Sequence, residues 1–123
     1  MKVLLSIKPE FAEKIFSGEK KFEFRRTIFK DRTVKKVLVY ASAPIQKVIG
    51  EFEIEEIVHE DVETLWQMTH RDSGITHEYF TSYFTGKEQG FAIKIKNLKR
   101  FKSAQCIRKD YNAVPPQSFM YIN

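Results

Sequence analysis

A change of hydrophobic period at Gly18 constrains the fold more than any other feature of the sequence. Before it, apolar side chains recur at helical spacing over residues 9–17, beginning after Pro9, a residue that suits a first helical turn. After it, apolar and charged residues alternate over residues 20–26, as they do in a half-buried strand. Glycine ends a helix readily because it adopts a left-handed conformation without strain. We therefore expect a helix over 9–17 that turns directly into a strand.

Further strands and helices follow the same two periods along the chain. We predict strands at 2–7, 34–40, 47–58 and 91–95, and helices at 62–68 and from Thr76 to just before Gly86. The buried stripe of the last helix is expected to be Tyr79, Phe80, Tyr83 and Phe84. Gly50 is expected to mark a bulge or a bend, and residues 114–121 an extended tail that closes the sheet. The segment from Leu98 is basic and less periodic. Together these elements predict a single α+β domain over 1–123, a small barrel of five or six mainly antiparallel strands with flanking helices.

Composition excludes several classes of protein. The chain has 123 residues, of which 42% are apolar and 14% aromatic, enough for one core and unlike a disordered chain. No apolar run approaches the roughly 20 residues of a membrane-spanning helix, and no signal peptide is recognisable, so we expect a cytoplasmic protein with no membrane partner. Cys106 is the single cysteine, and His59, His70 and His77 share no predicted helix face. We expect no metal site and no cofactor.

Positive charge is concentrated toward the C-terminal end of the sequence. Lys and Arg number 21 against 16 Asp and Glu, a net charge of +5. Residues 91–123 hold seven basic side chains and one acidic side chain, whereas residues 1–60 are nearly balanced, with 12 and 10. Clustered cations favour binding to phosphates. The pattern is compatible with a polyanionic partner, with a basic surface that binds another protein, and with an ordinary solvated face.

The densest cluster of charged residues lies on the predicted strand that follows the first helix. Lys21, Glu23 and Arg25 share one face of this strand, Lys20 lies at the corner between helix and strand, and Arg26 ends the run. On that face Glu23 can orient the cations while their remaining donors bind an anionic or polar ligand. The alternative is a solvated ladder of charges on an exposed strand, in which each pair contributes little.

Other candidate ligand-binding residues lie where predicted elements begin or end. Lys8 precedes the first helix, Tyr40 and Ser42 lead from a strand into a turn, and Gln117 and Ser118 follow two prolines. Their ammonium, hydroxyl and amide groups suit a phosphate or a base edge. Each also has an ordinary interpretation: an exposed lysine, a tyrosine packed at the rim of the sheet, or a segment held by its apolar neighbours.

The opening of the sequence resembles the N-terminal signature of the ASCH domain, a PUA-like β-barrel family associated with RNA. The signature's glycine, the lysine two positions on and the arginine seven positions on match Gly18, Lys20 and Arg25. The resemblance continues through Lys47–Phe52, Trp66, Ser73–Ile75, Phe91–Ile95 and Pro116–Phe119, the last of these being similar to a small bacterial and phage branch. It implies a PUA-like barrel with a cleft, lined by residues 18–26, that binds RNA or a nucleotide.

The resemblance leaves two activities open, binding and hydrolysis. One bacterial member of the family is an amidohydrolase of N4-acetylcytidine that uses a lysine in this motif, a threonine three residues later and a glutamate. Lys20 matches that lysine, but Glu23 stands at the threonine position and has no hydroxyl group. Other members are reported as ribonucleases, and acid–base work by Glu23 beside Lys20 and Arg25 suits phosphodiester cleavage. We expect a binding module that regulates RNA or translation, with hydrolysis by Lys20 and Glu23 as the alternative.

Overall fold

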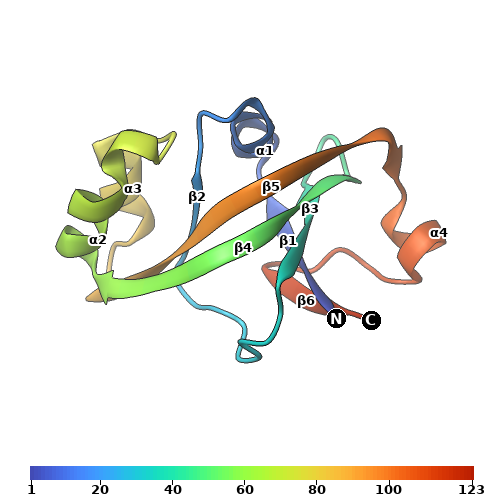
Figure 1. Cartoon of the computed structure of the whole chain (residues 1–123). Helices are drawn as coiled ribbons and strands as arrows, with labels where there is room; N and C mark the ends of the chain where they lie inside the picture. Colours follow the sequence, from blue (N-terminus) through green and yellow to red (C-terminus); the bar gives the residue numbers. More distant parts are fainter.

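The chain forms a strongly curved six-stranded sheet with four α-helices, and the computed structural model describes all of residues 1–123 (Figure 1). The strands are β1 (Lys2–Ile7), β2 (Phe22–Arg25), β3 (Lys36–Ala41), β4 (Lys47–Asp61), β5 (Gln89–Gln105) and β6 (Phe119–Ile122). The helices are α1 (Pro9–Ser17), α2 (Val62–Thr69), α3 (His77–Tyr83) and α4 (Ile107–Tyr111), with a 3-10 turn at His70–Asp72. The predicted mixture of helices and strands is confirmed.

The sheet is open rather than closed. Its strand order is β2-β5-β4-β3-β1-β6, so β2 and β6 are the two edges and no ladder joins them. Only β1 and β3 are parallel neighbours, which confirms a mainly antiparallel sheet. Both edge strands are four residues long, and a side chain bridges them: Arg25 on β2 donates hydrogen bonds to Ser6 on β1 and to Ser118 just before β6. The sheet curls toward the expected barrel without completing it.

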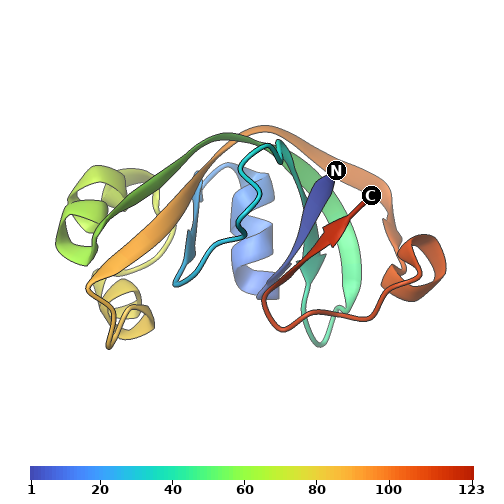
Figure 2. The same ribbon diagram turned by 90° about the horizontal axis from the view of Figure 1, so that it is seen from below.

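Helix α1 lies in the concave face of the sheet (Figure 2). It begins and ends where the sequence predicts, and Gly18 closes it with a left-handed φ of 88°. Ala12 and Ile15 are fully buried in the main core, against side chains from β1, β3 and β4. The register of β4 shifts beside Gly50, as predicted, and a Cβ atom there would lie 2.5 Å from the Phe16 ring of α1 and 2.6 Å from the Lys99 carbonyl oxygen. Glycine therefore lets β4 pass close under α1.

Strands β4 and β5 form a long twisted ribbon with α2 and α3 at one end and α4 at the other (Figure 1). The prediction that the strand at 91–95 ends before Leu98 was wrong, because β5 continues to Gln105. Three shifts of register along the ribbon and a left-handed Asn97, with φ 52°, break the alternation that a sequence pattern needs. Helix α4 was not predicted.

The connection between β4 and β5, residues 62–88, is a helical insert that packs on β2. Asp61 caps α2 and Thr76 caps α3, each accepting a hydrogen bond from a backbone N–H three residues on. The shared core of insert and sheet is Phe22, Phe24, Leu65, Phe80, Phe84 and Ala92. Burial of these side chains fixes the insert beside the edge strand, where it covers a face that would otherwise meet solvent.

Candidate functional site

A cavity of about 580 Å³ opens between β2, the start of α1, the helical insert and the segment before β6. Most residues singled out from the sequence line it, although they come from four separate parts of the chain. They are Lys8, Lys20, Glu23, Arg25, Arg26, Ser42, Gln117 and Ser118. The hydrophobic side chains in its wall include Phe11, Phe24 and Ile75.

Two of the predicted site residues lie elsewhere. Lys21 is exposed and outside the cavity, because β2 begins one residue later and the Lys21 backbone bonds instead to Asp72 and Ile95. Tyr40 is buried beneath α4 in a separate cluster that includes Leu38, which matches its interpretation as a packed tyrosine. Burial raises the pKa of the Tyr40 hydroxyl.

Arg25 is buried, with 9% of its surface exposed, and its two terminal nitrogens are fully used. One donates to the Ser6 carbonyl oxygen at 3.3 Å and to Glu23 Oε2 at 3.1 Å. The other donates to the carbonyl oxygen and to Oγ of Ser118, at 3.1 and 2.7 Å. Arginine suits this position because its planar fork bonds in several directions at once. Arg25 thus holds two walls of the cavity together and orients Glu23.

Glu23 is buried, at 6% exposure, but it keeps a free acceptor. Its Oε2 atom is bonded to Arg25, whereas Oε1 accepts no hydrogen bond from the protein, and the residue lines the cavity. A buried carboxylate favours a donor for each of its oxygens. Oε1 is therefore the atom of this site that is best placed to accept a hydrogen bond from a ligand.

Lys20 is the most deeply buried charged residue, at 3% exposure. Its Nζ atom donates to the Ser73 carbonyl oxygen at 3.1 Å and lies 4.7 Å from the centre of the Phe24 ring. Burial lowers the pKa of the ammonium group, Glu23 opposes that shift and Lys14 adds to it. Glu23 forms its ion pair with Arg25 and none with Lys20. Lys20 and Glu23 therefore present opposite charges to one cavity without a direct pair.

Three consecutive carbonyl groups fasten the insert to the segment that carries Lys20. The carbonyl oxygens of residues 72, 73 and 74 accept hydrogen bonds from the Lys21 backbone N–H, from Lys20 Nζ and from Lys14 Nζ, at 2.8, 3.1 and 3.0 Å. Gly74 has a left-handed φ of 68°, and a Cβ atom there would lie 2.7 Å from Lys20 Cβ. A glycine at this position lets the loop and the lysine stem approach each other.

An aromatic wall completes the site, and sequence reasoning missed it. The sequence predicts Tyr79 and Tyr83 as part of a buried helical stripe, but both are only half-buried and both line the cavity. Tyr83 donates from its hydroxyl to the Phe24 carbonyl oxygen at 3.1 Å, and burial raises its pKa. Tyr79 lies 5.7 Å beneath Lys8 Nζ. Two hydroxyl-bearing rings spaced i, i+4 beside Phe80 and Phe84 were the available signal.

The cavity beside β2 is distinct from a metal centre and from a membrane-spanning segment. No group of three or more His, Cys, Asp or Glu side chains is arranged to hold a metal ion. No helix has the length and apolar character needed to cross a bilayer. Trp66 lies outside the cavity, where it stacks on His77 and packs against Phe80.

Comparison with known proteins places this architecture in a family. The family model described as "ASCH domain" matches residues 5–103. An "ASCH domain-containing ribonuclease" of Zymomonas mobilis subsp. mobilis is 33% identical over 127 aligned positions, which cover 97% of this chain and 82% of that protein. A "Large ribosomal subunit protein uL22" of Ureaplasma parvum is 27% identical over 98% of this chain, and the match spans 39% of that longer protein.

Solved structures give the same result for the fold. The crystal structure of ASCH from Zymomonas mobilis superposes with a TM-score of 0.91 at 31% identity, covering 99% of this chain and 87% of that one. A serine-to-alanine variant of the Zymomonas protein superposes with a TM-score of 0.90 at 30% identity, covering 99% and 88%. The chain belongs to the ASCH domain family, which has a PUA-like RNA-binding fold.

Proposed function

We propose that this protein binds RNA by taking one nucleotide into the cavity beside β2. The observation that carries the proposal is the pair of buried, opposite charges at its wall, Lys20 and Glu23, which are not paired with each other. Burying a charged group costs free energy unless opposite charges and hydrogen bonds compensate it. Arg25 and the Ser73 carbonyl oxygen compensate these charges only in part. A base or ribose edge that offers an acceptor to Lys20 and a donor to Glu23 Oε1 would use the hydrogen-bonding capacity that remains.

The surroundings of these charges also suit a nucleotide. Tyr79 and Tyr83 supply aromatic surface against which a flat base can pack, and such stacking contributes about 1–3 kcal/mol per base. Lys8 and Arg26 are exposed at the cavity lining, where a phosphate remains partly hydrated. An unstacked nucleotide of a single strand offers a free base face and a free Watson–Crick edge, whereas both are occupied in a base inside a duplex. A cytoplasmic location and a role in regulating RNA or translation remain predictions from the sequence.

A neighbouring pair of lysines gives the proposal a matched test. Lys20→Met removes the buried ammonium, whereas Lys21→Met removes an exposed one outside the cavity at the adjacent position. We expect Lys20→Met to weaken binding of ribonucleotides and short single-stranded RNAs by tenfold or more, since a hydrogen bond to a charged group contributes about 1.5–3 kcal/mol. Lys21→Met should change the affinity by less than about threefold. Equal losses in the two variants, measured by titration calorimetry, would count against the cavity.

A second candidate function, RNA cleavage, is favoured by the relative named as a ribonuclease. In this chain Glu23 Oε1 would take the proton of a ribose 2′-hydroxyl, whose oxygen attacks the adjacent phosphorus. The 5′-oxygen then leaves with a proton from the Lys20 ammonium group, whose lowered pKa makes it a better acid than an ordinary lysine. Arg25 has no free hydrogen on its terminal nitrogens, so its part is to orient Glu23.

Glu23→Gln separates binding from cleavage. The variant keeps the shape of the side chain and removes the proton acceptor. If the protein only binds RNA, wild type releases no products from short RNAs, and the variant changes affinity alone. If it is a nuclease, wild-type turnover falls by a hundredfold or more in Glu23→Gln while RNA is still bound. Products are followed by mass spectrometry, with acetylated cytidine included as a further substrate.

A further inference from the structure

A second, more open cavity of about 340 Å³ lies on the other side of the loop that carries Lys20's carbonyl partner. Ser73, Gly74 and Ile75 form its wall, and Ile75 lines the first cavity as well. Lys14 and Lys20 bond to adjacent carbonyl groups of this loop, at residues 74 and 73. A single stretch of backbone therefore separates the two cavities.

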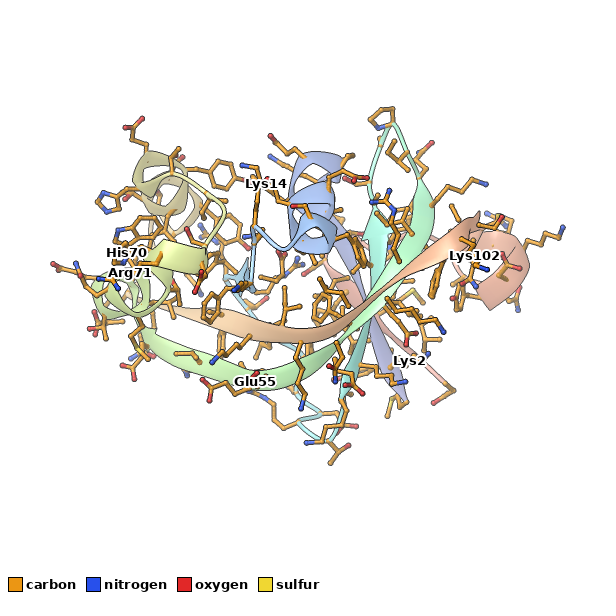
Figure 3. All side chains as sticks on the ribbon, turned by 45° about the horizontal axis from the view of Figure 1, so that its top comes forward. Lys2, Lys14, Glu55, His70, Arg71 and Lys102 are labelled. Atoms are coloured by element: carbon orange, nitrogen blue, oxygen red, sulfur yellow. The ribbon has the colours of Figure 1, made fainter.

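The lining of the second cavity suits an anion rather than an apolar ligand. Its side chains include Lys14, His70 and Arg71 against one acid, Glu19, and only one lining residue is hydrophobic. Arg71 is exposed and makes no ion pair or side-chain hydrogen bond within the protein, so all its donors are available. Figure 3 shows His70 and Arg71 together on the turn after α2, with Lys14 on α1 and Lys102 at the opposite end of the molecule.

His70 offers this cavity a second-nitrogen hydrogen-bond donor only when its ring is protonated. Its Nδ1 atom lies 3.2 and 3.3 Å from the carbonyl oxygens of Trp66 and Gln67, an arrangement that keeps a proton on Nδ1. The Nε2 atom then accepts a hydrogen bond when the ring is neutral and donates one only when the ring is protonated. Arg71, which is always charged, is therefore the main anion-binding group of this cavity.

We propose that the second cavity binds the phosphate on one side of the nucleotide held in the first cavity, while Lys8 and Arg26 take the phosphate on the other side. This inference rests on the proposed function, because a nucleotide must occupy the first cavity for its neighbour to reach the second. It adds a path for the bound strand, and the test below determines the direction in which the strand runs. The strand crosses the Ser73–Ile75 loop, with Arg71 on one flank and Lys8 on the other.

The test compares four ribonucleosides with their 5′- and 3′-monophosphates, using calorimetry at one fixed salt concentration. In wild type, each phosphate should tighten binding relative to the nucleoside. Arg71→Ala should remove the increase in affinity, about three- to tenfold, that one of the two phosphates provides. The increase provided by the other phosphate, and the affinity for the nucleoside, should be unchanged. Lys8→Ala should remove the gain from the opposite phosphate. The matched control is Arg108→Ala, an equal loss of charge on α4 at the far end of the ribbon (Figure 1).

Each other outcome overturns the inference in a distinct way. If Arg71→Ala leaves both phosphate gains intact, the second cavity does not bind phosphate. If Arg71→Ala lowers the affinity for the nucleoside by the same factor, Arg71 does not act on a phosphate. If Arg71→Ala and Lys8→Ala lower the affinity for the same monophosphate, the two residues do not bind phosphates on opposite sides of the nucleotide. Equal losses in Arg108→Ala indicate general electrostatic attraction. If wild type binds none of the twelve probes, the proposed function fails first and the inference fails with it.

Discussion

Strands β2 and β4 share a sequence pattern but not an environment. Both alternate apolar and charged residues over part of their length, so in each strand the charged side chains share one face. On β4, Glu55 pairs with Lys94 of β5 at 2.9 Å, and 44% and 41% of these side chains are exposed. On β2, Glu23 and Arg25 form a pair at 3.1 Å that is almost wholly buried.

The difference shows what the alternation of apolar and charged residues along a strand does and does not determine. It determines which residues share a face of the strand, but segments far away in the sequence decide whether water reaches that face. The helical insert and the segment before β6 cover the charged face of β2 and leave a cavity there. The outer charges of β4 line neither of the two cavities described above. A charged strand face becomes a candidate site only where other elements enclose it.

The largest expected effect is the loss of stability when the enclosed pair is broken. Arg25→Ala removes four hydrogen bonds and leaves Glu23 buried without its partner, so we expect the free energy of unfolding to fall by about 3 kcal/mol. The control is Arg100→Ala, which breaks an exposed two-bond pair with Glu13 and should cost about 0.5 kcal/mol. Urea unfolding measures the free energy of unfolding of both variants, and similar decreases in the two would contradict this prediction.

The aromatic wall of the enclosed face gives the next effect. Tyr79→Ala should weaken nucleotide binding by roughly tenfold, because the ring is half-buried at the cavity and is placed to stack with a base. Tyr121→Ala, on the edge strand β6 and outside the cavity, should leave the affinity unchanged. Fluorescence-detected titration of both variants is the measurement. Unchanged affinity in Tyr79→Ala would exclude this ring from the binding surface.

A smaller effect concerns pH. The pKa of Lys20 is lowered from its ordinary value of 10.5, so between the two values the unfolded chain binds more protons than the folded one. In that window Lys20 makes the free energy of unfolding rise with pH. Lys20→Met lacks this contribution, so the stability of wild type minus that of the variant should increase as pH approaches 10.5. Urea unfolding at several alkaline pH values tests this, and a constant difference would argue for a solvated ammonium.

The smallest effect is expected from the exposed cations at the far end of the ribbon. Lys102 and Lys109 are exposed and form no ion pair. The double variant Lys102→Glu with Lys109→Glu should bind a long single-stranded RNA about threefold more weakly at low salt, and its affinity for a mononucleotide should be unchanged. The dependence of affinity on salt, compared for both probes, is the readout. A loss for the mononucleotide would mean that charge acts on the cavity from a distance.

Local features of the fold were predictable from the sequence, and features that depend on distant contacts were not. The limits of α1 and the left-handed Gly18 follow from signals within ten residues, and both are confirmed. The second half of β5 was missed because bulges and Asn97 interrupt its alternation. The sheet's open seam was missed because periodicity indicates strands without indicating which edges pair.

The site divides in the same way. The segment around Gly18 marks Lys20, Glu23 and Arg25 as unusual, and all three line one cavity. Their burial was unforeseen, since it depends on an insert more than 40 residues further along the chain. Lys21 was grouped with them because strand alternation was extended one residue before β2 begins. Tyr79 and Tyr83 were assigned to the core because the helical period does not distinguish a core face from a cavity wall.

The edge strands β2 and β6 face each other across an open seam that the Arg25 side chain bridges. Separating any two neighbouring strands elsewhere breaks a backbone ladder, whereas the two edges are held together through side chains. Arg25 bonds to Ser6 and Ser118, and Phe29 packs on Phe119. The Tyr121 hydroxyl on β6 also accepts hydrogen bonds from the backbone of the segment that follows β2. The first cavity lies along this seam. Displacing these side chains would widen the seam and preserve every strand pairing. We therefore expect the upper size limit of the ligand to depend on how far these side chains can move, and not on the outline of the sheet alone.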